Sequence, residues 1–259
     1  KSFLQKIKTF QPDIIHAHYG LSGLLANSQR KIPVVTTYHG SDINTSGVYI
    51  LSRLNMVLSS HSIFVSNENR LKSGLSKNFT LLPCGVDTKI FVPGLKGESR
   101  KLLGLEKDQK LVLFSSAFDI AVKNSGLALS AIALLPDVRL LELKNYSRSQ
   151  VALLMNAVDV ALMTSFTEGS PQFIKEAMAC NCPVVSVPVG DVPFVLEGVE
   201  GCFIADYDAV AIAEKLKLAF NLGKRTEGRT RILELGWSTE KVAEKLLSVY
   251  SEILKTKPS

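Results

Sequence analysis

Two glutamates eight residues apart, Glu168 and Glu176, lie in the stretch of this chain whose residue types most clearly suggest chemistry. An apolar run at 158–163 precedes them, and a second apolar run at 183–189 follows. The helical composition of residues 171–180 between these runs predicts a strand, a loop, a helix and another strand. A parallel β-α-β unit places such a loop at the carboxyl end of the sheet, where open α/β proteins bind ligands. We therefore expect Glu168 at a ligand site.

The start of the predicted helix suits an anionic ligand. We expect Ser170 to be the N-cap and Pro171 the first helical residue, because both residue types favour those positions. The free N–H groups and the positive dipole at a helix N-terminus attract phosphate. Gly169 and Ser170 would then contribute to an anion site, with Glu176 further along the helix.

Length and composition predict a globular protein of one or two domains, with 259 residues, 46% of them hydrophobic and 21% charged. The net charge of +6 agrees with ordinary surface charge, but also with a nucleotide diphosphate or an anionic membrane surface as partner. The sequence has no basic helix with interleaved aromatic residues, which argues against nucleic acid as a partner. No apolar stretch is long enough to span a membrane, so we expect a cytoplasmic protein and leave peripheral membrane association open. The four cysteines have no zinc-ribbon spacing and are expected to be free thiols in a reducing compartment.

Apolar runs and helical segments alternate along the whole chain, which predicts an α/β fold with parallel sheets. Two prolines and a glycine interrupt this alternation within residues 83–93, a composition typical of a linker. We expect strands at 14–16, 34–38, 62–66 and 79–82 before the linker, and at 110–115, 138–143, 158–163, 183–189 and 201–204 after it. Helices are expected at 2–10, 21–29, 48–58, 67–75, 125–135, 149–157, 171–180, 208–222 and 240–255.

The segment Glu168-Gly-Ser-Pro-Gln-Phe-Ile-Lys-Glu-Ala-Met-Ala resembles the signature of the retaining glycosyltransferases of family 4. The linker Pro83-Cys-Gly-Val-Asp, followed by Phe91-Val-Pro, is similar to the passage between the two domains of that family. The resemblance implies the GT-B fold, with two Rossmann-like parallel-sheet domains facing a cleft. Residues 1–90 would form the acceptor-side domain. Residues 91–259 would form the donor-binding domain, with a C-terminal helix that returns to the first domain. Since the chain opens with Lys1 inside a β-α unit, we expect the first domain to lack its N-terminal part.

The resemblance also implies roles for residues of the second domain. Glu176 would accept hydrogen bonds from the ribose hydroxyls, and Glu168 would contact hydroxyls of the donor sugar. Lys123, in a loop after a strand, would bind the diphosphate together with Gly169, Ser170 and Pro171; the alternative is a solvated loop lysine. Gly190 and Asp191 follow the next strand and would border the donor, although both also suit a simple turn.

Histidines follow two strands of the first domain. His39 precedes Gly40 after the strand at 34–38, and the family uses a histidine in such a loop near the reacting sugar. A loop histidine bonded to the backbone is the alternative. His18, with Gly20 close by, is expected on the acceptor side of the cleft, whereas His16 is expected to be a buried histidine with its hydrogen bonds satisfied.

Two features depart from the family pattern. The Gly-Arg that usually precedes the donor-binding lysine is replaced by Ser115-Ser116-Ala117-Phe118, so one cation of the usual pair is missing. The segment between Leu143 and Ser149 is short, which indicates a reduced donor domain.

The resemblance implies a retaining transferase that moves a hexosyl group from a UDP- or GDP-sugar to a glycan, polysaccharide or lipid-linked acceptor. No cofactor and no metal are expected, since no Asp-x-Asp pair lies in a strand-end loop and preorganised dipoles with a lysine can stabilise the leaving diphosphate. The alternatives are a non-catalytic sugar-nucleotide-binding module and a GT-B epimerase.

Overall fold

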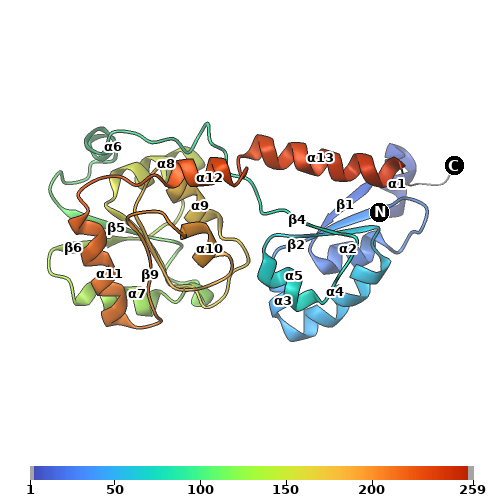
Figure 1. Ribbon diagram of the computed structural model, residues 1–259, viewed down its shortest axis with the longest axis horizontal. Helices are drawn as coiled ribbons and strands as arrows, with labels where there is room; N and C mark the ends of the chain where they lie inside the picture. The colour runs from blue at the N-terminus through green and yellow to red at the C-terminus, as the bar shows by residue number, and fades with distance from the viewer. Residues whose placement is uncertain (1–2, 256–259) are drawn as a thin grey trace. The chain divides into compact units, whose positions relative to one another are not determined.

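The computed structural model describes residues 3–255 and divides the chain into two compact α/β units (Figure 1). Within the described range, unit 1 contains residues 3–84 and 240–255, and unit 2 contains residues 85–239. The chain thus enters unit 2 at Gly85, whereas the sequence placed the boundary near residue 90. Both units have a parallel sheet, which confirms the predicted fold class.

Unit 1 has a four-stranded parallel sheet in the order β1-β2-β3-β4, so each strand pairs with the next one in sequence. The strands are β1 (Ile15–His18), β2 (Val34–Tyr38), β3 (His61–Phe64) and β4 (Phe79–Leu81). The helices of this unit are α1 (Phe3–Phe10), α2 (Gly20–Ala26), α3 (Ser41–Asn44), α4 (Ser46–Leu58), α5 (Asn67–Ser73) and α13 (Thr239–Lys255), which begins one residue before the unit boundary.

Successive side chains along each strand point to opposite faces of the sheet. The two faces of this sheet therefore pack against different helices. On one face, Val35 and Ile63 pack against apolar residues of α13, namely Val242, Leu246, Tyr250 and Ile253. On the other face, Thr36 and Tyr38 accept hydrogen bonds from the buried Asn55 of α4. The apolar stripe predicted at residues 240–255 therefore packs against the sheet of unit 1.

Unit 2 has a five-stranded parallel sheet in the order β6-β5-β7-β8-β9. The strands are β5 (Lys110–Phe114), β6 (Val138–Leu141), β7 (Val160–Met163), β8 (Val184–Ser186) and β9 (Cys202–Ile204). Helices α6 (Lys96–Leu103), α8 (Arg148–Ala157), α9 (Gln172–Ala179) and α12 (Gly228–Glu234) cover one face, and α7 (Ser125–Ala133) and α11 (Ala209–Asn221) cover the other (Figure 1). The unit also contains the short helices η1 (Ala121–Lys123) and α10 (Val192–Leu196).

The core of unit 2 is larger and more continuous than that of unit 1. All four residues of the central strand β7 are fully buried, as expected for a parallel strand covered on both faces. Trp237, the only tryptophan of the chain, belongs to this core and is 7% exposed.

The start of α9 differs from the prediction. The helix begins at Gln172, and Pro171 occupies the N-cap without a side-chain cap hydrogen bond. The prediction that Ser170 caps this helix was therefore wrong by one position. The Ser170 hydroxyl instead accepts a hydrogen bond from Lys175 Nζ at 3.1 Å.

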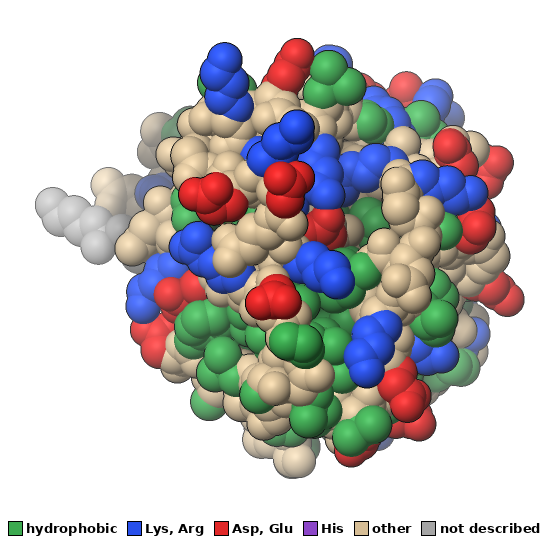
Figure 2. Space-filling model, turned by 90° about the vertical axis from the view of Figure 1, so that its left-hand side faces the viewer, with side chains coloured by type: hydrophobic (Ala, Val, Ile, Leu, Met, Phe, Trp, Pro, Cys, Tyr) green, Lys and Arg blue, Asp and Glu red, His purple; other side chains and the backbone are tan. Residues whose placement is uncertain are grey.

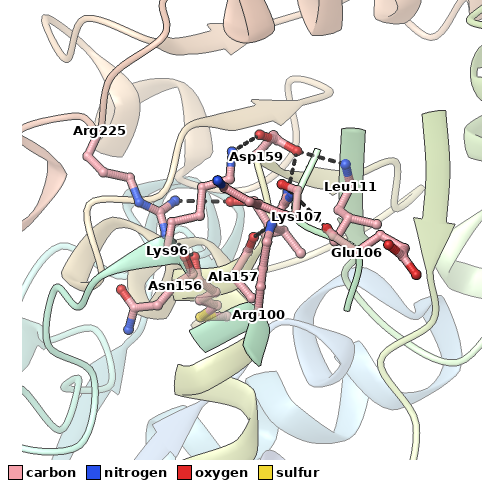
Figure 3. Close-up of polar contacts among 11 residues, drawn as sticks. Lys96, Arg100, Glu106, Lys107, Leu111, Asn156, Ala157, Asp159 and Arg225 are labelled. Carbon is pink, nitrogen blue, oxygen red and sulfur yellow. Dashed lines mark hydrogen bonds and ion pairs between the residues drawn. The ribbon is translucent and has the colours of Figure 1, made fainter. Parts of the chain in front are cut away.

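A polar cluster forms where β5 begins and α8 ends (Figure 3). Asp159 Oδ2 accepts from Arg100 Nη2 at 2.9 Å and from the Leu111 amide at 2.7 Å, and Oδ1 pairs with Lys96. Arg100, only 3% exposed, also donates to the carbonyl oxygens of Ala157, Glu106 and Lys107. Arg225 donates to the carbonyl oxygens of Met155, Asn156 and Val158 at the same helix end. Both guanidinium groups thus satisfy carbonyls that a helix C-terminus leaves free.

The face of unit 2 drawn in Figure 2 carries basic and acidic side chains mixed together, rather than one large patch of a single sign. The positive net charge is therefore not gathered into a basic stripe on this face. In the range 3–255, none of the helices is both long and apolar enough to cross a membrane.

Candidate functional site

The predicted donor residues of unit 2 lie at the carboxyl ends of neighbouring strands. The loop after β5 contains η1 and Lys123, and the loop after β7 contains Glu168. Thr164 joins these loops, because its hydroxyl donates to the carbonyl oxygens of Lys123 at 3.1 Å and Asn124 at 2.9 Å. The Phe166 amide donates to the Val122 carbonyl at 3.0 Å. β5 and β7 are adjacent in the sheet, so their strand-end loops meet.

Lys123 and Glu168 form a direct ion pair, with 2.6 Å between Nζ and Oε1. Their side chains are 25% and 15% exposed, so the pair is partly shielded but reachable. The structure thus brings together the two residues predicted to bind the diphosphate and the donor sugar. The ion pair fixes the position of the Lys123 ammonium, which distinguishes this residue from a solvated surface lysine.

The loop after β8 packs on the same site. Gly190 has a φ of +57°, and a Cβ there would lie 2.5 Å from the Gly169 carbonyl oxygen. The Asp191 amide donates to the same Gly169 oxygen at 3.1 Å. Gly190 is therefore needed both for its turn and for this close approach, and its predicted contact with the donor stays a prediction.

Burial changes the protonation of Asp191. Both of its carboxylate oxygens are buried and have no hydrogen-bond partner among the described residues. Burial raises the pKa of Asp191 to about 6, although Ser170 and Lys175 nearby counteract this effect.

Glu176 lies in the second turn of α9 and is 6% exposed. Burial raises its pKa, and the Arg148 guanidinium opposes this by pairing with Oε1 at 2.9 Å. Arg148 also lies over the ring of Phe91, with 4.9 Å to the ring centre. Nothing in the sequence pointed to Arg148, because it belongs to another helix, 28 residues before its partner.

In unit 1, the structure brings His18 and His39 together. His18 Nδ1 and His39 Nε2 are 2.8 Å apart, with ring centres at 5.1 Å, and the Tyr19 ring lies 4.8 Å from His39. A hydrogen bond between two imidazoles needs one N–H and one free nitrogen, so the pair cannot hold this bond with both rings protonated. The prediction that these histidines face Glu168 across a cleft stays a prediction.

Asp42 organises the loops that carry both histidines. Its carboxylate accepts hydrogen bonds from the amides of His39 and Gly40 at 3.0 Å each, and from Gly20 at 3.2 Å. It is 2% exposed, and burial raises its pKa despite these bonds. Sequence reasoning missed this role, although an acid three residues after His39 in a glycine turn was a usable signal.

Gly20 has a packing role that the prediction did not include. A Cβ at Gly20 would lie 2.1 Å from Ser52 Oγ and 2.9 Å from Ser52 Cα of α4. The close approach of α2 to α4 therefore needs a glycine, whatever part Gly20 has in acceptor binding.

His16 has its hydrogen bonds satisfied by protein groups. Its Nδ1 lies 2.5 Å from the Tyr250 hydroxyl of α13, and its Nε2 lies 2.7 Å from Thr37 Oγ1. Burial, with smaller contributions from His18 and His39, lowers the pKa of His16 to about 4. The hydrogen bonds of His16 are thus satisfied as the sequence analysis expected, whereas the residue is only partly buried.

This lowered pKa predicts a pH dependence of stability. An unfolded His16 binds its proton near pH 6.5, whereas the folded protein resists protonation down to about pH 4. The unfolded state therefore binds more protons between these values, and the free energy of unfolding should fall as the pH drops from about 6.5 toward 4. Urea denaturation at several pH values should show a shallower fall for His16→Gln than for the parent. Equal pH slopes in both proteins would contradict this role of His16.

Comparisons with known proteins match both parts of the sequence to glycosyltransferases. The family model described as Glycosyltransferase Family 4 matches residues 1–90, and the model described as Glycosyl transferases group 1 matches residues 109–221. A D-inositol 3-phosphate glycosyltransferase of Mycobacterium marinum is 26% identical over 247 residues, covering 76% of this chain and 53% of that protein. The putative teichuronic acid biosynthesis glycosyltransferase TuaC of Bacillus subtilis is 26% identical, covering 82% of this chain and 62% of that protein. The chain thus spans only about half to three fifths of the length of these two relatives.

Solved structures show the same fold at lower sequence identity. Sucrose-phosphate synthase from Thermosynechococcus elongatus matches with a TM-score of 0.85 and 21% identity, covering 98% of this chain and 77% of that chain. Anabaena HepE in complex with UDP matches with a TM-score of 0.82 and 15% identity, covering 96% and 81%. With the family models matching both parts of the sequence and the signature helix in place, the chain belongs to the family 4 glycosyltransferases of the GT-B fold.

Proposed function

We propose that this chain provides the donor-binding unit and acceptor-side residues of a retaining glycosyltransferase that uses a UDP- or GDP-sugar. The observation that carries the proposal is the Lys123–Glu168 ion pair beside the Gly169–Ser170 loop, at the start of α9. This arrangement offers a cation and backbone amides for a diphosphate, next to a carboxylate that can accept from sugar hydroxyls. Structures of HepE with UDP and with UDP-glucose support a nucleotide-sugar donor.

In the reaction, the bond between the anomeric carbon and the diphosphate oxygen breaks while the acceptor hydroxyl oxygen bonds to that carbon. The products are the new glycoside, the nucleoside diphosphate and a proton. Negative charge grows on the leaving diphosphate in the transition state. We assign its stabilisation to the Lys123 ammonium and the Gly169 and Ser170 amides, which take the place of a divalent metal.

In this proposal, Glu176 binds the ribose of the nucleotide-sugar donor. An ionised carboxylate only accepts hydrogen bonds, which suits the vicinal hydroxyls of a ribose. Arg148 supports this role, because its guanidinium favours the ionised form of the buried Glu176. The His18–His39 pair is assigned to the donor sugar and the acceptor, and the Tyr19 ring beside it offers a flat apolar surface.

The acceptor class in this proposal is a glycan, a polysaccharide or a lipid-linked saccharide. Its support is the similarity to a relative whose name places it in teichuronic acid biosynthesis. Calorimetry with UDP and GDP, followed by turnover assays on several nucleotide sugars with the full gene product, tests the proposal. Binding without turnover would favour a sugar-nucleotide-binding module, and interconversion of sugar epimers would favour an epimerase.

Replacing Glu176 with alanine should weaken nucleotide binding. A hydrogen bond to a charged group contributes about 1.5–3 kcal/mol, so the Kd for UDP or GDP should rise about tenfold or more. Arg148 would lose its partner, but it is 56% exposed and can be hydrated. Calorimetry measures the change, and Glu200→Ala is the matched control because this exposed carboxylate pairs with Lys224 on the same unit. A Glu176→Ala protein with the affinity of the parent would remove the ribose assignment.

A further inference from the structure

Lys175 is a lysine buried inside unit 2, directly beneath the proposed donor loop. It is 1% exposed, although lysine is almost never fully buried without a reason. Its ammonium donates to the Ser170 hydroxyl at 3.1 Å and lies 5.8 Å from the centre of the Trp237 ring. Its neighbours Phe173, Ile174, Ala177 and Met178 on α9 are all buried, so an apolar residue would have suited this position for packing alone.

A buried carboxylate, that of Asp191, lies near Ser170. Both oxygens of Asp191 are buried without a hydrogen-bond partner among the described residues, and the Asp191 amide is tied to the Gly169 carbonyl. Lys175 is close enough to Asp191 to favour its ionised form. The Gly169–Ser170 loop thus has a cation and a carboxylate directly behind it.

A carboxylate in this place opposes the binding of a diphosphate, because both are anions and the surroundings screen their repulsion poorly. Ser115-Ser116-Ala117-Phe118 offers no arginine to compensate, so Lys123 has no second side-chain cation in that segment. A positive charge behind the loop would offset the repulsion and hold the Ser170 hydroxyl in a fixed orientation.

We propose that Lys175 is a positioning residue of the diphosphate site, which holds Ser170 in place and neutralises Asp191 from inside the fold. It supplies the second positive charge of the site without touching the donor. This inference rests on the proposed function, since it specifies how the same site accommodates the charge of its nucleotide.

The test compares UDP with uridine, or GDP with guanosine, because only the diphosphate should respond to the charge behind the loop. Lys175→Met keeps the length of the side chain and removes its charge. We expect the Kd for the diphosphate to rise about tenfold, which corresponds to about 1.4 kcal/mol of binding free energy. The Kd for the nucleoside should change less than twofold. Lys224→Met, at an exposed lysine of the same unit, is the control and should change neither.

The double variant Lys175→Met/Asp191→Asn separates this role from simple packing. If Lys175 acts by neutralising Asp191, removing the carboxylate should bring diphosphate affinity back to within threefold of the parent. Asp191→Asn alone, which leaves Lys175 in place, should bind the diphosphate at least as tightly as the parent. This single variant also provides the test if Lys175→Met does not fold.

Three results would overturn the inference while the proposed function stands. The first is a Lys175→Met protein that binds the diphosphate like the parent, and the second is an equal loss of affinity for diphosphate and nucleoside in Lys175→Met that the double variant does not rescue. The third is weaker diphosphate binding by Asp191→Asn alone. A parent protein that binds neither UDP nor GDP would instead overturn the proposed function, and this inference with it.

Discussion

Replacing Lys123 with alanine is expected to lower the turnover of a nucleotide sugar by about 100-fold or more, because removing one preorganised donor from developing negative charge costs about 2.7–4 kcal/mol. The structure holds the Lys123 ammonium 2.6 Å from Glu168, and Thr164 fixes the loop that carries it. Without Lys123, the diphosphate would lose its cation and also face an unpaired Glu168 carboxylate. Calorimetry should accordingly show a larger loss of affinity for UDP or GDP than for the nucleoside monophosphate.

The control for this variant is Lys144→Ala. Lys144 also pairs with a carboxylate, that of Asp119, at 2.8 Å, but both side chains are well exposed. Its removal should leave turnover unchanged. Glu168→Ala should spare the affinity for free UDP or GDP and impair turnover, since Glu168 is assigned to the donor sugar. Parent-like binding and turnover by the Lys123 and Glu168 variants would remove the donor-site assignment.

Most of the sheet architecture could be predicted because it depends on local patterns. The apolar run at 160–163, which follows Asp159, favours a buried strand in a chain of this composition, and β7 (Val160–Met163) is that run. The alternation of such runs with amphipathic segments then determines parallel sheets. The order β6-β5-β7-β8-β9 places β7 next to β5, which brings Lys123 to Glu168 from 45 residues away.

Several of the helices that sequence reasoning missed lack a local signal. Helix α6 (Lys96–Leu103) is mostly polar, α10 (Val192–Leu196) has only five residues, and α12 (Gly228–Glu234) begins with a glycine. Each is held by contacts with distant segments. Arg100 of α6 bonds to the Ala157 carbonyl, and Gly228 of α12 lies so close to α9 that a Cβ would be 2.9 Å from Met178 Cα.

The candidate functional site likewise contains residues with a local sequence signal and residues that depend on distant contacts. Residues next to a strand end, such as His39 and Glu168, could be proposed because topology alone places them there. Arg148 and Tyr250 act through partners on other elements, so only the folded chain reveals them. Lys175 is intermediate, since a charged residue among the apolar positions of the signature helix was visible in the sequence but had no interpretation without its contact with Ser170.

The second large effect concerns stability, and it arises at the opposite end of the sheet from the donor loops. Asp159→Ala should lower the free energy of unfolding of unit 2 by about 3–5 kcal/mol, the usual loss when one partner of a buried ion pair is removed. Arg100 would remain 3% exposed with its carboxylate gone, and the Leu111 amide at the start of β5 would lose its acceptor. Domains are stable by only about 5–15 kcal/mol, so the variant should be near its limit at room temperature.

Urea denaturation followed by fluorescence measures this change, because Trp237 is the only tryptophan and lies in the core of unit 2. Asp119→Ala is the control, since this exposed carboxylate also pairs with a lysine but should show no measurable loss. Adding Arg100→Met to Asp159→Ala should recover part of the stability, because it removes the unpaired buried charge, although the carbonyl oxygens of Ala157 and Glu106 then lose a donor.

At urea concentrations where the variant is folded, UDP should bind as in the parent, since the donor loops lie at the carboxyl ends of the strands. A change in unfolding free energy below about 1 kcal/mol, the range of exposed ion pairs, would show that Asp159 is not the anchor of this cluster.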